Sequence, residues 1–488
     1  MPRPQQSRSP APPTRKASAL VVQDEPSRAD ARRAAEIRAR QEQTQRAVLT
    51  SVFGTAIHFF GPLTGWFSDL SDPRDQSRIT YPLASLLWAG VLMFVCRVGA
   101  RRQIGLLLRT ETASANFAVM LGVEGVPHGD TLEKAFRRLE PDQGQEVVSS
   151  LVETLLRKRV LERYRLLGRY YVVVIDGTGY LSFDQRHCPH CLTKTHKGGT
   201  TTYYHTVLEA KLVTPSGLAL SLMTEFVEND APNPSKQDCE LKAFYRLCAR
   251  LKARFPRLPI LLSLDGLFAG GPTFQLCAGY GWRFIVTLQD ADLVSVHRAF
   301  EALAPRQTPN TLTFRPAGAP TTQQHYSWVN EISYTDSERR GHLLSMLVCT
   351  EKTSAADGSK SSTTFKWVTN CRISASSAVE VASNAGRARW KIENEGFNVQ
   401  KNGGYNLEHA YTTNFTSAKI FYFLLQIAHL LTQLVSKGDL LTTLLAEPLG
   451  SVKNLAFRFL EALRNTILAS DFIERILHTR FQVRFDSS

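Results

Sequence analysis

The chain has 488 residues, 43% of them hydrophobic, so it is long enough for about two to four domains with a large buried core. Its formal net charge of +14 at pH 7 favours a polyanionic partner, usually nucleic acid, although a basic enzyme without such a partner is the alternative. The eight cysteines lie mostly alone in apolar surroundings, which excludes a disulfide framework and indicates a reducing compartment. The N-terminal residues lack the apolar core of a secretory signal, so we expect a cytoplasmic protein.

Residues 1–47 are interpreted as a basic leader. Residues 1–26 are rich in Pro, Ser and Arg, which predicts disorder. Residues 27–48 favour a helix with only a weak apolar face. The leader either contacts DNA or is a solvated segment without a role, and the sequence leaves both interpretations open.

Residues 48–165 are predicted to form a helical DNA-binding region. The apolar run at residues 81–96 is short for a membrane span and contains Pro and Gly, so a buried helix is the better interpretation. Asp130 is expected to cap the helix that follows it. Basic side chains gather around these helices, which favours contact with DNA. The predicted helices cover 83–98, part of 101–121, 131–139 and 147–166, and the basic residues are Arg97, Arg101, Arg102, Arg137 and Arg138.

The pattern changes at about residue 166, where sheet-forming sequence begins. Residues 171–176 form an apolar run that ends in Asp176, which predicts a buried central strand. A second apolar strand at 259–265 also ends in an Asp, followed by Gly. The other predicted elements of residues 166–304 are strands at 203–213, 217–227 and 283–288 and helices at 236–253 and 272–280.

Residues 305–370 alternate polar and apolar side chains between Gly- and Ser-rich turns, which predicts a β-rich insertion. Helical sequence returns at 371–440, and residues 441–488 are expected to add one or two further helices. The sequence therefore predicts a multidomain α/β fold, in which a mixed sheet flanked by helices is interrupted by the insertion and preceded by the helical region.

The two strands that end in aspartate indicate a metal site. Carboxylates at neighbouring strand ends of an open α/β sheet converge on one rim, where they repel unless a cation lies between them. Mg²⁺ prefers such oxygen ligands, and a pair of Mg²⁺ or Mn²⁺ ions can catalyse phosphoryl transfer. A third carboxylate is expected from a helix predicted at 376–402. In an α-helix Glu393 shares a face with Arg389 and Phe397, whereas Glu395 lies about 200° away, so Glu393 is the predicted ligand.

The segment from Arg389 to Glu393 resembles the C-terminal signature of DDE insertion-sequence transposases with a β-strand insertion before the catalytic Glu. That signature reads Tyr, two residues, Arg, three residues, Glu, six residues, Lys. Arg389 and Glu393 match it with the correct spacing. The chain departs from it at the Tyr position, which is Gly386, and at the Lys position, which is Gln400, with Lys401 one residue late.

The segments Val174-Ile-Asp176 and Leu264-Asp265 likewise resemble the two Asp-bearing strands of the family's RNase H-like core. Asp176 and Asp265 are 89 positions apart, and Glu393 follows after another 128, a gap that contains the predicted insertion. The resemblance implies that these three acids bind catalytic Mg²⁺ and that Arg389 and Lys401 contact DNA. It also implies cleavage and strand transfer of double-stranded DNA at the ends of a mobile element, by a homodimer in a synaptic complex at a prokaryotic nucleoid.

Other interpretations of the same residues stay open. An Asp before Gly at a strand end is often only a turn residue, and Glu393 alone is more often an ion-pair partner of Arg389. An RNase H-like nuclease without strand transfer would carry the same acids. A domesticated transposase derivative that only binds DNA is a further alternative, although all three acids are present.

A second metal site is predicted at a Cys-x-x-Cys motif. Cys188, Cys191, His196 and His205 could hold a structural Zn²⁺ in tetrahedral geometry. The alternatives are a loop with unliganded thiols and, with less support, a redox pair.

Aromatic residues offer weaker hypotheses. Tyr203 and Tyr204, near Lys194 and Lys197, either contact DNA or are ordinary strand residues, and Trp328 either stacks on an unpaired base or belongs to the core.

Overall fold

The computed structural model describes residues 28–62, 65–122, 125–231, 234–307, 310–355, 359–445 and 449–485. The leader at 1–26 that is predicted to be disordered lies outside these residues. The chain divides into two units, Met1–Thr44 and Gln45–Ser488. Helix α1 (Arg28–Phe60) confirms the helix predicted at 27–48, and its first part, which belongs to the first unit, is almost entirely exposed.

The N-terminal part of the second unit is helical, as predicted, although the predicted cap of α5 is wrong. Helix α5 begins at Gly129, before Asp130, so the capping residue is His128, whose Nδ1 accepts a hydrogen bond from the Asp130 amide at 3.2 Å. The main helices are α2 (Leu83–Val95), α4 (Glu111–Leu121), α5 (Gly129–Phe136) and α6 (Pro141–Arg157), with short turns at η2 (Gln76–Arg78), η3 (Arg101–Gln103), α3 (Ile104–Leu107) and η4 (Glu162–Tyr164).

Two apolar helices form the centre of the second unit. Helix α2, which covers the apolar run at 81–96, is buried along all but one of its residues, so the prediction of a buried helix is confirmed. Helix α13 (Phe415–Lys437) is the one described helix that is long and apolar enough to cross a membrane, and 94% of its apolar window is buried inside the protein. Such burial is typical of a core helix.

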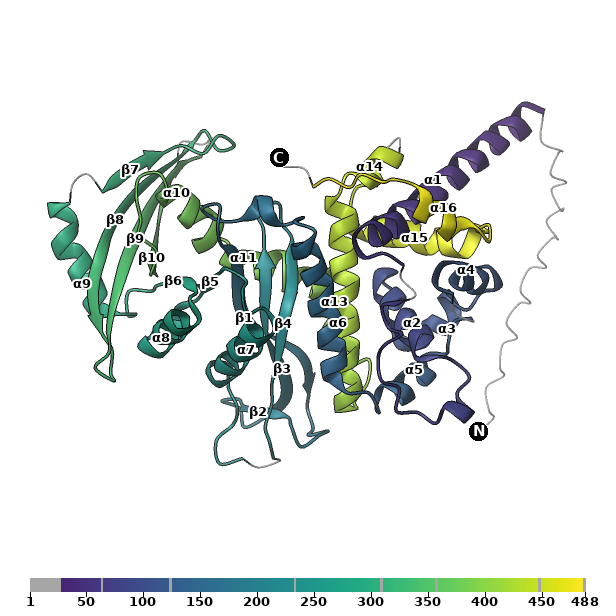
Figure 1. Cartoon of the computed structure of the whole chain (residues 1–488), viewed down its shortest axis with the longest axis horizontal. Helices are drawn as coiled ribbons and strands as arrows, with labels where there is room; N and C mark the ends of the chain where they lie inside the picture. The colour runs from purple at the N-terminus through teal and green to yellow at the C-terminus, as the bar shows by residue number, and fades with distance from the viewer. Residues whose placement is uncertain are drawn as a thin grey trace, which may run out of the picture. The chain divides into compact units, whose positions relative to one another are not determined.

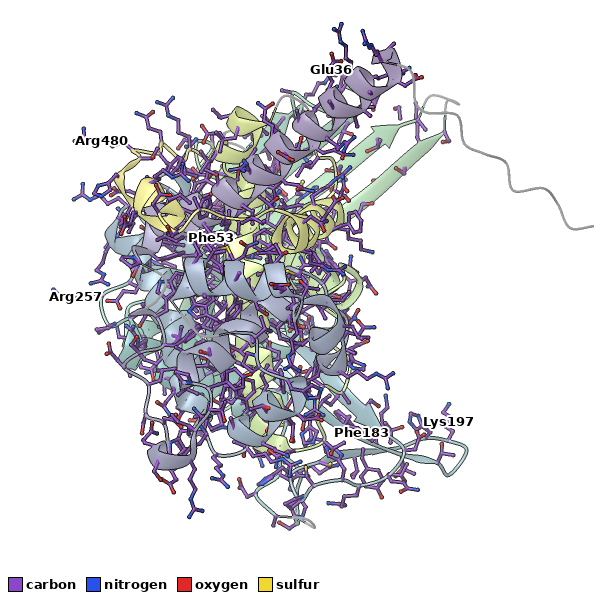
Figure 2. All side chains as sticks on the ribbon, turned by 90° about the vertical axis from the view of Figure 1, so that its right-hand side faces the viewer. Glu36, Phe53, Phe183, Lys197, Arg257 and Arg480 are labelled. Carbon is purple, nitrogen blue, oxygen red and sulfur yellow. The ribbon has the colours of Figure 1, made fainter. Side chains whose placement is uncertain are left out.

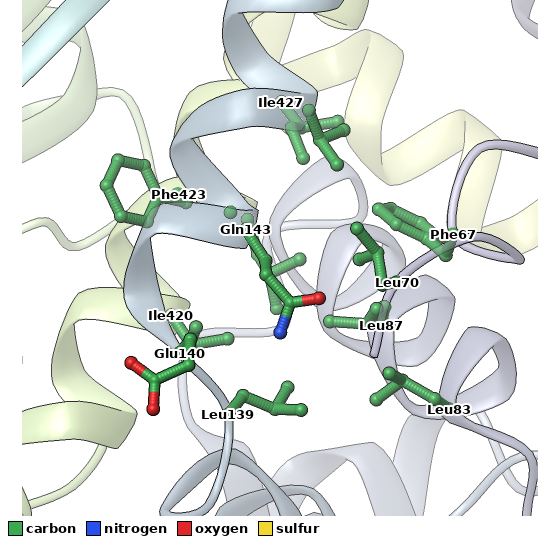
Figure 3. Close-up of a pocket in the computed structure, with 13 residues that line it drawn as sticks. Phe67, Leu70, Leu83, Leu87, Leu139, Glu140, Gln143, Ile420, Phe423 and Ile427 are labelled. Carbon is green, nitrogen blue, oxygen red and sulfur yellow. The ribbon is translucent and has the colours of Figure 1, made fainter. Parts of the chain in front are cut away.

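These helices pack on one another around a small apolar cavity, which Figure 3 shows between α2, α6 and α13. Phe67 and Leu87 line it on one side and Ile420 and Phe423 on the other. Glu140 and Gln143 are polar residues of its lining, and Gln143 accepts a hydrogen bond from the Ser71 amide at 2.6 Å. The helical region therefore shares a hydrophobic core with α13 and the sheet, and it has no separate core of its own.

Ten strands of the described residues form one open mixed sheet (Figure 1). Their order is β2-β3-β1-β5-β6-β10-β9-β8-β7, and β4 also pairs with β3. The β1–β5 and β5–β6 pairs are parallel, and all others are antiparallel. The strands are β1 (Tyr171–Phe183), β2 (Leu192–Thr195), β3 (Thr201–Val213), β4 (Ala219–Val227), β5 (Ile260–Leu264), β6 (Arg283–Thr287), β7 (Thr311–Phe314), β8 (Thr322–Thr335), β9 (Gly341–Ser354) and β10 (Lys360–Thr369).

The β-rich character predicted for residues 305–370 is confirmed by strands β7–β10, and these strands extend the main sheet. Strand β10 pairs with β6 through partners such as Val368 and Val286. A second hydrophobic cluster includes residues of β8, β9 and β10 together with residues of β1, β5 and β6. Trp328 of β8 is only 2% exposed and belongs to that cluster, so the core interpretation of this residue is confirmed.

Helices cover both faces of the sheet around β4. The Glu225 side chain accepts hydrogen bonds from Arg246 and Arg250 of α7 (Glu240–Arg254), whereas the next residue, Phe226, packs on Tyr422 and Phe423 of α13. Successive strand residues point to opposite faces, so α7 and α13 lie on opposite sides of the sheet. The remaining helices are α8 (Gly271–Tyr280), α9 (Val294–Leu303), α14 (Leu440–Leu444), α15 (Val452–Asn465) and α16 (Phe472–His478), with short turns η5 (Gly266–Phe268) and η6 (Ala304–Arg306).

The helix predicted at 376–402 is not one regular α-helix. Two π-helical segments interrupt it, so the residue spacing of an ideal α-helix does not hold along its length. From the N-terminal end, the segments are α10 (Ala378–Val381), the π-helix η7 (Ala382–Gly386), α11 (Arg389–Lys391), the π-helix η8 (Ile392–Phe397) and α12 (Asn398–Asn402).

Candidate active site

The first two predicted acids lie side by side on parallel neighbouring strands. The register pairs Val174 of β1 with Ser263 of β5, so Asp176 is level with Asp265, which directly follows β5. The prediction that β1 ends at Asp176 is wrong. Strand β1 continues to Phe183, because antiparallel pairing with the long strand β3 supports it after β5 has ended. The two carboxylates therefore meet where β5 stops beside a strand that continues.

Asp176 is held by one backbone and one side-chain hydrogen bond. Its Oδ1 accepts from the Gly177 amide at 2.9 Å, and its Oδ2 accepts from the Arg389 guanidinium at 3.2 Å. Burial raises the pKa of the Asp176 carboxyl, and Asp265 and Glu393 raise it further, while the Gly177 amide and Arg389 oppose the shift. Asp265 and Glu393 thus both act electrostatically on the Asp176 carboxyl.

Asp265 also has the structural role of a turn residue. Its side chain caps η5 by accepting a hydrogen bond from the Leu267 amide at 3.0 Å. This bond fixes the carboxylate at the end of β5, and the side chain remains partly exposed. The turn interpretation therefore holds for Asp265 and is compatible with a ligand role, because a carboxylate has two oxygens and further lone pairs.

Glu393 belongs to the π-helix η8, near enough to Asp176 to raise the pKa of that carboxyl. Glu395 lies elsewhere, close to the β3–β4 turn, where a β-carbon at Gly217 would be 3.7 Å from its Cδ. The α-helical register that separates the two glutamates is wrong, because both lie within a π-helical segment, and the choice of Glu393 as the ligand stays a prediction.

A fourth carboxylate, not predicted from the sequence, lies at the same rim. Glu240 is the first residue of α7, and a β-carbon at Gly177 would collide with its carboxylate. Burial raises the pKa of Glu240, and Asp176 and Asp265 raise it further. The sequence signal for this contact is the glycine that directly follows Asp176 inside a strand, which indicates close approach by another group.

The structure accounts for both departures from the transposase signature. At the Tyr position, a β-carbon on Gly386 would lie 2.6 Å from the Trp367 indole, so only glycine fits without a shift. At the Lys position, Gln400 is fully buried and its Nε2 is 2.9 Å from Oε1 of Gln426 and 3.0 Å from Nδ1 of His429. A charged side chain at this position would lose the hydration that an ammonium group requires.

The two residues predicted to bind DNA are engaged within the protein. Arg389 bonds to Asp176 and stacks over the ring of Trp390 at 4.3 Å, and Trp390 is 55% exposed. Lys401 forms an ion pair with Glu408 at 3.0 Å. Neither arrangement prevents contact with phosphate, but each residue would have to exchange or share its present partner.

The basic residues of the helical region are also partly neutralised. Arg101 and Arg137 both pair with Glu133, at 3.7 and 2.6 Å. Arg97 donates to the carbonyls of Phe94 and Gly403 and stacks on Tyr405. Arg102 and Arg138 are exposed, and among the described residues neither has an ion pair.

The predicted zinc ligands are only partly brought together. Cys188, Cys191 and His205 cluster, and His187 is the fourth member of this group. His196 is exposed and bonds instead to Thr202 at 2.9 Å, because it lies in the loop that joins β2 to β3. The ligand prediction is therefore wrong for His196.

Tyr203 and Tyr204 are residues of β3, as the strand interpretation predicts.

One comparison relates part of this chain to a known family. Residues 64–152 match the family described as DDE_Tnp_1-associated, which points to the DDE-type transposases. The matched segment contains α2, α4, α5 and most of α6, of which α2, α5 and α6 pack against α13, and it ends before the strands that carry Asp176 and Asp265. No curated protein matches the chain.

Proposed function

We propose that this chain is a DDE-type transposase that cleaves DNA at the ends of a mobile element and transfers the cleaved strands to target DNA. The observation that carries the proposal is that Asp176 and Asp265 lie level on the parallel strands β1 and β5, with Glu393 near enough to raise the pKa of Asp176. The match of residues 64–152 supports it independently, because that segment lies outside the strands and helix that hold the acids. The pairing of β1 with β5 agrees with the RNase H-like core that the sequence resemblance implies.

The donor set fits Mg²⁺ or Mn²⁺. The raised pKa of Asp176 reflects burial and the repulsion of neighbouring carboxylates, a situation that a hard cation with oxygen ligands relieves. Asp176, Asp265 and Glu393 would hold the metal, with Glu240 next to them. When bound, such ions activate the attacking oxygen and stabilise the leaving oxygen in phosphoryl transfer. Arg389 orients the Asp176 carboxylate through its hydrogen bond to Oδ2.

A joining experiment separates the transposase from the RNase H-like nuclease. The substrate is labelled duplex DNA that carries the sequences flanking the gene, incubated with the full chain, Mg²⁺ and an unlabelled target. A transposase yields cleaved ends and labelled products covalently joined to target DNA. Cleavage without any joined product would favour the nuclease, and DNA binding without cleavage would favour a domesticated derivative. Two element ends must meet during joining, so we propose a homodimer as the active assembly.

The Glu240 carboxylate provides the first test of the site. In the metal-free folded protein the pKa of the Glu240 carboxyl is raised, so the folded state binds this proton more tightly than the unfolded state does. The free energy of unfolding therefore falls as the pH rises from the ordinary pKa of a glutamate through the raised pKa. Glu240→Gln removes this charge. We therefore expect the variant to melt at a higher temperature than wild type at neutral pH in EDTA, and to gain less stability from Mg²⁺.

Differential scanning fluorimetry with and without Mg²⁺ measures both effects, and Glu395→Gln, away from Asp176 and Asp265, is the matched control. The assignment of Glu240 to the site fails if Glu240→Gln destabilises the metal-free protein or responds to Mg²⁺ as wild type does.

The second test concerns DNA binding by the helical region. A fragment of residues 48–165 would lack the core that it shares with α13, so the test uses the full chain. Replacing the exposed Arg102 and Arg138 by Ala is expected to weaken binding to terminal DNA. The slope of log affinity against log salt should fall by about 0.9 for each phosphate that the protein no longer neutralises.

Fluorescence anisotropy over a salt series gives that slope. Arg257→Ala removes an exposed arginine outside the helical region and is the control. Unchanged affinity and slope in the double variant would place DNA-end binding in another part of the chain.

A further inference from the structure

A cluster of two thiols and two imidazoles lies at the far end of β1, formed by residues that the acid site does not use. After Phe183 the chain leaves β1 and brings His187, Cys188 and Cys191 against His205 of β3. Their four ligand atoms all lie within 4.8 Å of one another. His205 and Cys191 are buried, and His187 and Cys188 are half-buried, so the cluster is enclosed by protein on most sides.

We propose that His187, Cys188, Cys191 and His205 form a structural Zn²⁺ site. Zinc prefers four ligands in a tetrahedron, with bonds of about 2.3 Å to sulfur and 2.0–2.1 Å to nitrogen. Those bond lengths place two sulfurs about 3.8 Å apart and a sulfur and a nitrogen about 3.6 Å apart.

The distances between the ligand atoms in the structure are close to those expected around zinc. The two Sγ atoms are 3.5 Å apart, and Nε2 of His205 is 3.3 Å from Sγ of Cys188 and 3.5 Å from Sγ of Cys191. Nδ1 of His187 is 3.5 Å from Sγ of Cys191. Four of the six separations are thus close to those of a zinc tetrahedron, and all six are within 4.8 Å.

Two other histidines near the cluster make different contacts, so they are excluded from the proposed set of zinc ligands. His190 lies between the two cysteines in sequence, but its Nδ1 is 2.8 Å from the carbonyl oxygen of Asn229 and its ring stacks on Phe415 at 4.3 Å. His196 bonds to Thr202 in the exposed loop. His187 instead packs on Phe183 at 3.9 Å, with its Nδ1 turned toward Cys191.

Zinc at this position would join the segment after β1 to strand β3. The ligands connect residues 187–191 to β3, and His205 also contacts Phe415 at the start of α13. The hairpin β2–β3 projects beyond the cluster, and Figure 2 shows Lys197 at its tip and Phe183 near its base. A metal there would fix the base of this basic hairpin, a structural role separate from the acid-bearing rim.

The test measures zinc in the full chain, purified in reductant without chelator, by plasma mass spectrometry. We expect about one zinc per chain in wild type and less than about a tenth in Cys188→Ser and His187→Ala, because structural sites need four ligands. The matched controls are His196→Ala, a nearby histidine, and Cys239→Ser, an exposed cysteine, and both should keep the metal.

Cobalt substitution gives a readout that does not depend on the folding of a variant. Wild-type protein reconstituted with Co²⁺ should show thiolate charge-transfer and tetrahedral d–d absorption. Absence of zinc together with a failure to bind added Zn²⁺ or Co²⁺, or a disulfide between Cys188 and Cys191 in the purified protein, would overturn the proposal. Loss of zinc in His196→Ala but not in His187→Ala would overturn this ligand set. None of these results depends on DNA cleavage.

Discussion

Glu393→Gln is expected to reduce single-turnover DNA cleavage by at least about a thousandfold, whereas Glu395→Gln should retain most of the activity. A metal ion contributes several kcal/mol of transition-state stabilisation, and each ~1.4 kcal/mol corresponds to a factor of ten in rate. An amide cannot replace a carboxylate ligand of Mg²⁺. Glu393 lies by Asp176, whereas Glu395 lies by the β3–β4 turn at Gly217.

The two variants are close controls for each other. Both replace a partly buried glutamate of η8 by its amide, two positions apart, so general effects on the π-helix should be similar. The comparison is made at equal protein concentration and saturating Mg²⁺, with DNA affinity measured for both proteins. Equal losses would indicate a structural effect on η8, and the reverse ranking would assign the ligand role to Glu395.

Asp176→Asn and Asp265→Asn are each expected to abolish cleavage to a similar extent while leaving DNA affinity nearly unchanged. Both side chains belong to the proposed metal site, where Asp176 and Asp265 lie level on the neighbouring strands β1 and β5. Asp176→Asn also removes the anionic partner of Arg389, which leaves that guanidinium available for phosphate. Quantitative cleavage and anisotropy assays on the same preparations separate catalysis from binding.

The matched control is Asp290→Asn. Asp290 is an exposed aspartate that pairs with Lys366 on the surface, so its removal should change neither measurement by more than about twofold. Full cleavage by Asp176→Asn or Asp265→Asn would remove that aspartate from the metal site. A parallel loss of DNA binding would instead mean that the carboxylate supports the binding surface.

The sequence predicts the sheet well because apolar strands carry a strong local pattern. The run before Asp176 and the run before Asp265 are both buried strands, and their parallel pairing brings the acids together. The fold class is confirmed as a mixed α/β arrangement with one open sheet flanked by helices. The β-rich character of residues 305–370 is confirmed as well.

The features that were not predicted depend on contacts between distant segments. Strand β1 continues beyond Asp176 because β3 pairs with it, and β10 joins the main sheet by pairing with β6. Glu240 reaches the acids because Gly177 leaves space at the sheet surface, 63 positions away in sequence. Such long-range packing leaves no periodic signal in a single sequence.

Local geometry explains the remaining errors. An α-helical spacing of 100° per residue does not apply through η7 and η8, and no residue pattern in this segment predicts a π-helix. His187 was not among the predicted zinc ligands because sequence spacing does not reveal which histidine the turn at 187–191 directs to Cys191. The side-chain directions in that turn are set by its packing on Phe183 and Phe415.

The metal dependence of cleavage tests the central claim most directly. Single-turnover cleavage of labelled duplex DNA that carries the flanking sequences of the gene is measured for wild type and Asp265→Asn in Mg²⁺, in Mn²⁺, in Ca²⁺ and in EDTA. We expect wild type to cleave only in Mg²⁺ or Mn²⁺, to bind DNA in Ca²⁺ without cleaving it, and Asp265→Asn to be inactive throughout. Cleavage by wild type in EDTA, or by Asp265→Asn in Mg²⁺, would contradict catalysis by metal ions held at this rim.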